Sequence, residues 1–290
     1  MEQYALDAVE RITTRPPEGY GSIGVDPLTP LIGAEISGLD LSKELTEDQG
    51  DELKRAFLAH HVLVFRDQHM SGDDHKRIAG HFGELHLVAA PVEDSDPYIL
   101  ELSTTKDSRA VAGNGWHADG TADAEPSLGS MLYITRTPEI GSGGDTLFAD
   151  MHMAYELLSP AMKTFLDGLT AVHDGLLPWQ GETPPADYVV PKNEHPVVAR
   201  HPETGRKLLF VNGAYTSHIP QLTRAESRAV LDMLYAHIAG TPMLSCRVRW
   251  APNTLVFWDN RCVQHHATWD YYPHSRYGQR IAIKGQRPQA

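Results

Sequence analysis

Apolar and polar positions follow two different periods along this chain. Helical spacing predicts four helices, over residues 44–60, 71–82, 153–169 and 224–239. In the first, Leu53, Ala56 and Phe57 fall on one face, and in the second Ser71 and Asp73 can cap the helix start. These helices therefore have one face available for a core.

Short apolar runs separated by turn residues predict that most of the other elements are strands. We expect short strands within 23–41, a buried strand at 61–66, and further strands at 97–102, 128–135, 208–212, 244–250, 254–258 and 280–284. Many short strands with a few helices indicate a mainly β fold. The predicted architecture is a jelly-roll or β-sandwich core with helices packed outside.

Two segments lack such a pattern. Residues 1–20 are predicted to form a poorly defined N-terminal arm that is closed by Pro16 and Pro17. Residues 175–194 contain four prolines and little periodicity, which is typical of a long loop, and long loops in compact domains are often lids. Nothing else divides the chain, so residues 21–290 are predicted to form a single domain.

Composition narrows the class of protein. The 290 residues carry a formal charge of −13, and so acidic a chain repels phosphates and anionic lipids, so neither nucleic acid nor a membrane is an expected partner. Cys246 and Cys262 are too few for a disulfide framework. The N-terminus lacks the apolar run of a signal peptide, and no stretch is apolar enough for a membrane span. These features predict a cytoplasmic protein.

The first candidate for chemistry is WHAD at residues 116–119. In an extended segment, residues two apart point to the same side, so His117 and Asp119 can reach one metal ion. Two histidines and one carboxylate on one face of iron are typical of non-haem Fe(II) oxygenases, but the third ligand must come from elsewhere. An isolated pair of this kind is usually an ordinary surface pair, so the motif is weak on its own.

A second cluster, WDNR…QHHA…DY…R…R over residues 258–280, strengthens this interpretation. It occurs together with FGELH at 82–86, GGDT at 143–146, HPVV at 195–198, HPETGRK at 201–207 and FVN at 210–212. Across roughly residues 30–287 the chain resembles the taurine and 2,4-dichlorophenoxyacetate dioxygenases, the TauD/TfdA family. The resemblance implies a double-stranded β-helix (a cupin-like jelly-roll) and an enzyme that depends on Fe(II), 2-oxoglutarate and O2.

The resemblance also assigns the iron ligands. It makes His265, directly after Gln264, the third ligand beside His117 and Asp119. His266 is expected to point to the opposite face of the strand, because a shift of one residue turns a side chain to the other side. The carboxylate at Asp119 favours oxygen transfer over halogenation, since related halogenases have a small residue there.

Two arginines have expected roles in the same family. Arg276 is expected to hold the distal carboxylate of 2-oxoglutarate with help from Thr146, because a guanidinium is a permanently charged fork that matches a carboxylate. Arg280 lies four residues further on, hence on the same face of a strand. It is expected to bind the anionic group of the prime substrate.

Val88, Asn114 and Tyr215 are the remaining candidate substrate contacts. Taurine enzymes have His and Phe where this chain has Val88 and Tyr215, which argues against taurine. With Arg280, these two residues resemble the carboxylate pocket of the (R)-2-phenoxypropionate, or dichlorprop, dioxygenases. A Val and a Tyr in strand-like segments are, however, equally ordinary packing residues.

Other polar and aromatic residues are expected to support the site or the fold. The residues expected to pack against or orient the ligands are Trp116, Trp258 and Asn260. The histidines without metal-ligand spacing of their own, expected to be structural or part of the lid, are His86, His173, His195, His201 and His218.

The predicted activity is hydroxylation of a C–H bond in a small anionic substrate, an aryloxyalkanoate whose ether bond then breaks, with release of succinate and CO2. Within the family the alternatives are an alkylsulfonate or sulfate-ester dioxygenase and a biosynthetic oxygenase of an amino acid or natural product. Outside the family the alternatives are a zinc hydrolase and a non-catalytic jelly-roll that binds 2-oxoglutarate. The sequence contains no general-base motif such as HExxH, which argues against the hydrolase. A homo-oligomer (dimer, trimer or tetramer) is expected.

Overall fold

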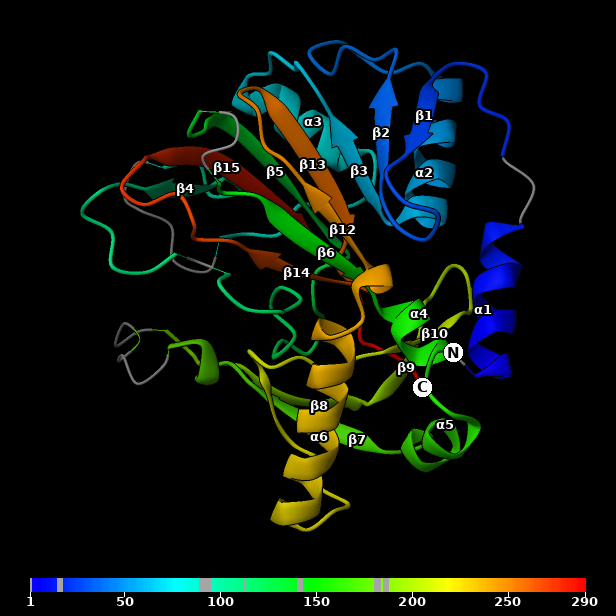
Figure 1. Ribbon diagram of the computed structural model, residues 1–290. Helices are drawn as coiled ribbons and strands as arrows, with labels where there is room; N and C mark the ends of the chain where they lie inside the picture. The colour runs from blue at the N-terminus through cyan, green and yellow to red at the C-terminus, as the bar shows by residue number, and fades with distance from the viewer. Residues whose placement is uncertain are drawn as a thin grey trace.

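Antiparallel sheets dominate the computed structural model (Figure 1), which describes residues 2–14, 18–88, 95–111, 113–139, 143–179, 184 and 188–290. The largest sheet has seven strands, in the order β1 (Gly24–Pro27), β2 (Ala34–Ser37), β3 (Val62–Phe65), β13 (Thr254–Asp259), β5 (Gly129–Arg136), β15 (Arg276–Ile283) and β4 (Leu100–Thr104). Its neighbouring strands are antiparallel except β2 and β3. The expectation of a strand-rich fold with a few helices is confirmed.

Three smaller sheets complete the strand content of the described residues. One contains β12 (Ser245–Val248), β6 (Thr146–Asp150) and β14 (Val263–Ala267). The others contain β11 (Thr216–His218), β7 (Thr170–Asp174) and β8 (Lys192–Pro196), and β10 (Lys207–Leu209) with β9 (Val198–Arg200). Strands β6, β7, β8, β9 and β11 were not predicted from the sequence.

Alternating side chains divide the core into two layers. In β3, Val62 and Val64 contribute to a core cluster that includes Phe148 of β6, whereas Leu63 and Phe65 contribute to a second cluster on the other face of the large sheet. The period of two follows from strand geometry. Part of the first cluster therefore lies between the large sheet and the β12–β6–β14 sheet, where Phe148 packs near the candidate ligand His265.

Helices α2 (Glu47–His60) and α3 (Gly72–Gly80) cover the outer face of the large sheet (Figure 1). Both begin at a capping box, from Thr46 in α2 and from Ser71 in α3, as predicted for Ser71. Because Thr46 is the cap, α2 begins later than the expected residue 44.

The helix expected over 153–169 is wrong as a single element. The segment forms α4 (Met151–Glu156) and α5 (Pro160–Leu166), because Ser159 caps a new helix whose first residue is Pro160. By contrast, α6 (Arg224–Ala239) has the predicted bounds. Two short 3₁₀ helices, η1 (Leu177–Trp179) and η2 (Pro242–Leu244), complete the helical content of the described residues.

The N-terminal segment is more ordered than expected. Instead of a poorly defined arm, it forms α1 (Gln3–Thr13), whose Ala5 and Ala8 are buried and whose Val9 and Ile12 pack against the first core cluster. The expected arm thus contributes to the core.

The expected lid at 175–194 contains η1 and ends earlier, because β8 begins at Lys192. Residues 180–183 and 185–187 of this expected loop, and Pro16 and Pro17 of the expected arm, lie outside the described residues.

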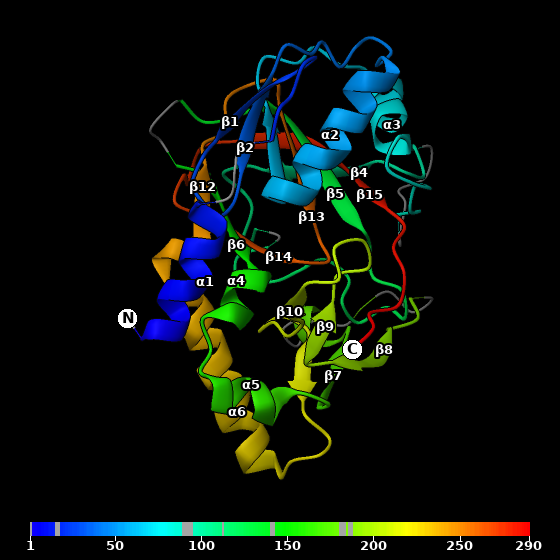
Figure 2. The same cartoon turned by 90° about the vertical axis from the view of Figure 1, so that its right-hand side faces the viewer.

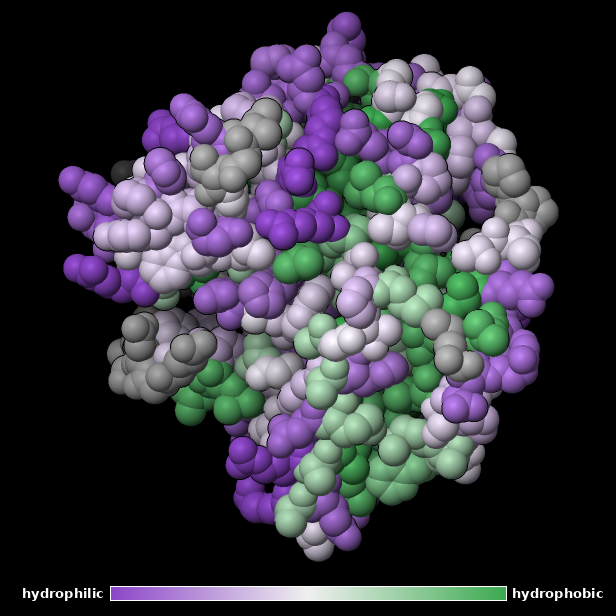
Figure 3. Space-filling model, viewed as in Figure 1, coloured by the Kyte–Doolittle hydropathy of each residue, from purple (hydrophilic) through white to green (hydrophobic). Residues whose placement is uncertain are grey.

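Figures 2 and 3 show the remaining general features. The view in Figure 2 separates the large sheet with α2 and α3 from a second region that contains α5, α6, β7 and β8. On the face in Figure 3, hydrophilic residues cover most of the upper and left edges, and hydrophobic ones gather at the centre and lower right. Among the described residues, no helix combines the length and apolarity that crossing a bilayer requires.

Candidate metal centre

A single backbone pairing brings two of the three predicted ligands together. The N–H of His117 donates to the carbonyl of His265 at 3.0 Å, and the N–H of His265 donates to the carbonyl of His117 at 2.7 Å. Residues that exchange both hydrogen bonds in an antiparallel pair lie directly opposite each other with their side chains on one face. The two imidazole rings accordingly lie with their centroids 4.1 Å apart.

A tight turn ahead of His117 orients its ring. The Nδ1 atom of His117 donates to the carbonyl of Gly115 at 2.8 Å, so in the neutral ring the Nε2 atom carries a free lone pair. Gly113 adopts a φ of 81°, and a Cβ there would lie 2.9 Å from Cε1 of His117. Only glycine combines that backbone conformation with this close approach.

The third predicted ligand, Asp119, is held at its backbone and at its carboxylate. The side-chain amide of Asn260 accepts from the Asp119 N–H at 2.7 Å and donates to its carbonyl at 2.9 Å. Ser130 Oγ donates to Oδ2 at 3.0 Å, and Arg280 Nη1 donates to Oδ1 at 2.6 Å. The carboxylate therefore has a defined orientation before any ion binds.

The charges in the site suit a cation. Burial raises the pKa of the Asp119 carboxyl, but Arg280 and then His265 and His117 outweigh burial and hold that pKa well below its usual range. Burial, followed by the nearby His117, lowers the pKa of His265. At neutral pH the carboxylate is thus ionised and the His265 ring is neutral, which are the states that bind a metal.

The three side chains fit one divalent ion. The Nε2 atoms of His117 and His265 each lie 3.8 Å from Oδ1 of Asp119, and the three candidate ligand atoms all lie within 4.8 Å of one another. Two imidazoles and one carboxylate are the donor set that iron accepts with positions left open. The geometry therefore brings together the residues that the sequence analysis selected.

Arg276 and Thr146 meet through a residue that sequence reasoning missed. The indole N–H of Trp250 donates to Thr146 Oγ1 at 3.0 Å, and the Arg276 guanidinium lies 5.1 Å from the centre of a Trp250 ring. Arg276 is buried, and its Nε atom has no hydrogen-bond partner in the described part of the chain. Burial lowers the pKa of this guanidinium. The arrangement leaves a desolvated positive charge beside a hydroxyl group.

Arg280 and Tyr215 lie next to the triad. Arg280 contacts Asp119 directly, which the sequence analysis did not anticipate. Burial, and next the Asp119 carboxylate, raise the pKa of the Tyr215 hydroxyl to about 12, so the phenol is neutral. Arg280 thus contacts the triad, and the Tyr215 hydroxyl lies within electrostatic reach of Asp119.

Of the two tryptophans expected to pack against the ligands, Trp258 contacts His265, whereas Trp116 contacts His266. Trp258 packs with its ring 4.8 Å from that of His265, and Trp116 packs edge-on against His266 at 5.8 Å. The partly buried His266 therefore has aromatic packing of its own.

Two other candidate substrate contacts are less directly connected. Asn114 is exposed in the turn before His117. The backbone N–H of Val88 donates to the carbonyl of Pro97 at 2.8 Å. Among the described residues, no hydrogen bond joins the Asn114 side chain to the triad, and the apolar Val88 side chain cannot form one.

Comparison with known proteins agrees with this geometry. Residues 24–282 match the model of the family described as "Taurine catabolism dioxygenase TauD, TfdA family". The chain is 35% identical to an alkylsulfatase of Acinetobacter baylyi (89% of this chain, 84% of the relative). It is 34% identical to the alpha-ketoglutarate-dependent 2,4-dichlorophenoxyacetate dioxygenase of Cupriavidus pinatubonensis (84% and 91%).

Its fold is similar to the crystal structure of a taurine dioxygenase from Burkholderia xenovorans, with a TM-score of 0.81, 34% identity and coverage of 92% of this chain and 91% of the other. These matches span nearly the whole chain, and the family model covers His117, Asp119 and His265. The chain therefore belongs to the TauD/TfdA family of 2-oxoglutarate-dependent dioxygenases, which use Fe(II), 2-oxoglutarate and O2.

Proposed function

We propose that this enzyme hydroxylates a C–H bond of a small anionic substrate, with iron held by His117, Asp119 and His265. The observation that carries the proposal is the convergence of both Nε2 atoms on Oδ1 of Asp119. The paired sheets around this point support a double-stranded β-helix, or jelly-roll, within one domain.

We infer that Arg276 and Thr146 bind the distal carboxylate of 2-oxoglutarate. No carboxylate forms a salt bridge with Arg276 in the described residues, and a buried unpaired charge is costly. A dicarboxylate ligand would supply the missing anion, and the Thr146 hydroxyl would satisfy a further lone pair. Trp250 contacts both groups, through its N–H to Thr146 and through its ring to Arg276.

Bound iron would provide the centre at which O2, the oxidant, reacts with 2-oxoglutarate and the substrate, and the protein residues supply position. Ser130 and Asn260 fix the Asp119 carboxylate, and Gly115 fixes the tautomer of His117. Such fixed ligands hold the reacting atoms in one geometry.

For the prime substrate we propose an aryloxyalkanoate bound at Arg280 beside Tyr215. Arg280 already pairs with Asp119, so a substrate anion would share this guanidinium rather than meet a free one. An alkylsulfonate or sulfate ester is an equally supported alternative, because similar proteins act on each class.

The test is succinate formation by the protein with Fe(II), 2-oxoglutarate and O2. Aryloxypropionates, alkylsulfonates, sulfate esters and amino acids are offered in parallel. We expect a large increase in succinate with one class of anion. Absence of succinate with every substrate, together with no 2-oxoglutarate binding to the Fe(II) form under anaerobic conditions, contradicts the proposal.

Measurements of ligand binding can distinguish the roles of Arg276 and Arg280. Arg276→Ala should raise the Kd of 2-oxoglutarate at least tenfold, because it removes the charge that faces the distal carboxylate. Arg280→Ala should mainly weaken the prime substrate, and Arg280→Lys, which keeps a charge near Asp119, is its matched control. Metal affinity is measured in each variant. Equal loss of both ligands in either alanine variant refutes this division of roles.

Assembly and location remain predictions. The two cysteines are free and buried, which fits the expected reducing, cytoplasmic compartment. Light scattering of the purified protein tests the expected homo-oligomer.

A further inference from the structure

A second group of metal-binding side chains lies outside the candidate metal centre. His61, His152 and Cys262 offer ligand atoms that all lie within 4.8 Å of one another. The three residues are fully buried, with at most 1% of their surface exposed. They come from the C-cap of α2, from α4 and from the turn before β14.

Two nitrogen atoms in this group have no hydrogen-bond partner in the described part of the chain. His152 donates from Nδ1 to the carbonyl of Lys207 at 2.9 Å, so its Nε2 atom carries a lone pair, and that atom is unpartnered. The Nδ1 atom of His61 is also unpartnered. Buried polar atoms without partners are rare, and an ion or water often accounts for them.

The neighbouring group of His201, Asp259 and Cys262 is different, because its polar atoms are already used. His201 accepts at Nδ1 from the N–H groups of Glu203 and Thr204, so its Nε2 carries the proton that it donates to Asp259 at 3.0 Å. Asp259 also accepts from Arg261 at both oxygens. The side-chain nitrogen and oxygen atoms of His201 and Asp259 therefore already have partners. A metal ion bound to Cys262 would instead take its other ligands from His61 and His152.

We propose that His61, His152 and Cys262 form a second metal site, for a borderline or soft cation such as Zn(II). Imidazole nitrogen and thiolate sulfur are the donors that such cations prefer over oxygen. A tetrahedral centre with bonds of about 2.0–2.3 Å to two nitrogens and one sulfur separates these atoms by roughly 3.3–3.6 Å. Closing the site therefore needs side-chain movements of about 1 Å.

Protonation and charge are compatible with a cation. Burial lowers the pKa of His61 well below its usual range and that of His152 to about 3, so both rings are neutral. Burial, and next Asp259, raise the pKa of the Cys262 thiol. A bound cation displaces that thiol proton to solvent, and the nearby carboxylate then favours the cation.

One contact opposes binding. Arg206 Nη1 lies 3.3 Å from Nε2 of His61, so ligation through Nδ1 places a proton on Nε2 and turns the flexible Arg206 side chain away. The metal–thiolate bond has to offset the loss of this contact.

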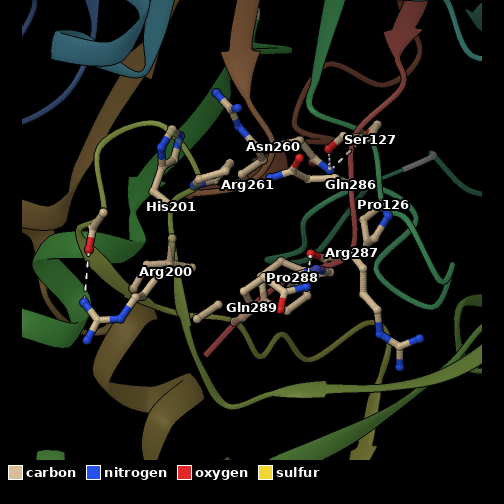
Figure 4. A pocket seen from close by; sticks show the side chains of 15 residues that line it. Pro126, Ser127, Arg200, His201, Asn260, Arg261, Gln286, Arg287, Pro288 and Gln289 are labelled. Carbon is tan, nitrogen blue, oxygen red and sulfur yellow. Dashed lines mark hydrogen bonds between the residues drawn. The ribbon is translucent and has the colours of Figure 1, made fainter.

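A cavity lies next to this site. It has a volume of about 220 Å³, and its lining includes His201, Arg261 and Asn260 (Figure 4). The His201 ring lies 5.7 Å from that of His152, and Arg261 directly precedes Cys262. The His201 side chain thus lies between this cavity and His152.

Cobalt(II) titration of the full-length protein tests the proposal, because only a thiolate ligand produces a sulfur-to-cobalt charge-transfer band. The candidate iron centre contains no sulfur. We expect two cobalt ions per chain in the wild type, with the band, and the band should persist in the double variant His117→Ala/His265→Ala. Cys262→Ser should abolish the band and reduce the stoichiometry from two ions to one.

The matched control is Cys246→Ser, which alters the other buried cysteine and should keep the band. X-ray absorption of the zinc-loaded double variant provides a measurement that does not depend on the Cys262 variant folding. It should show one sulfur ligand at about 2.3 Å. A wild type without the band, a band that survives Cys262→Ser, or only nitrogen and oxygen around zinc overturns the proposal. The activity of the iron centre does not enter any of these readouts.

Discussion

At the scale of single residues, the oxygens of Asp119 are divided between different partners. Ser130 donates a hydrogen bond to Oδ2. Oδ1 accepts from Arg280 and faces the Nε2 atoms of His117 and His265. Partners of this kind orient a ligand and raise its affinity for a metal. We therefore expect Ser130 to act through Asp119 as a positioning residue.

Ser130→Ala should raise the Kd of Mn(II) or anaerobic Fe(II) about tenfold, because Asp119 loses the bond that orients it. Isothermal titration measures the change. The control is Ser227→Ala, which removes another buried hydroxyl, bound to the N–H of Ile219. An unchanged Kd for Ser130→Ala, or the same rise in both variants, contradicts the assigned role.

The sequence predicted the three candidate ligands and two residues that contact them, Asn260 and Trp258, but it did not predict Ser130 or Trp250, for a physical reason. His117, Asp119 and His265 occur in motifs with recognisable spacing. Ser130 lies in an apolar strand segment and Trp250 follows one, so both are expected to pack, and neither signals its partner. Trp250 bonds to a residue 104 positions away, and such a pairing exists only after the sheets have formed.

At the scale of elements, predictions were correct where periodicity and capping agreed. Helix α6 begins after Thr223, whose capping box with Glu226 matches the start of the apolar period. The break between α4 and α5 was signalled by Ser159 and Pro160, but continuous apolar spacing obscured it. Strand β8 carries mostly polar residues and therefore gave no strand signal.

Helix α1 provides a test at this scale, because its inner face was not predicted. Ala8→Gln places a larger polar side chain where 1% of the surface is exposed, and should lower the free energy of unfolding by about 1–3 kcal/mol. Chemical denaturation measures this loss. Glu10→Gln, on the exposed side of the same helix, should have almost no effect. Equal stability of the two variants would mean that α1 does not pack as described.

At the scale of the whole molecule, buried histidines make stability depend on pH. Burial lowers the pKa of His75 to about 4, and those of His152 and His173 to about 3. The unfolded chain binds these protons near pH 6.5, whereas the folded chain does not. These histidines therefore do not lower the free energy of unfolding above pH 6.5. They lower it progressively as the pH falls from 6.5 towards the pKa values of the folded protein.

His75→Leu should remove one share of this dependence. Between pH 7 and pH 5 its free energy of unfolding should fall by about 2 kcal/mol less than that of the wild type. Urea denaturation at both pH values measures the difference. The control is His69→Leu, which replaces a histidine at an exposed position. If His75→Leu loses as much stability as the wild type, His75 does not stay neutral in the folded protein.

The reciprocal backbone bonds between His117 and His265 have one more consequence. Two ligands from distant parts of the chain sit at a single rung, so their spacing does not depend on how long or variable the intervening segments are. Insertions between the two segments can reshape the substrate chamber without disturbing the rung. Such an arrangement allows the substrate range to change while the candidate metal centre keeps its geometry.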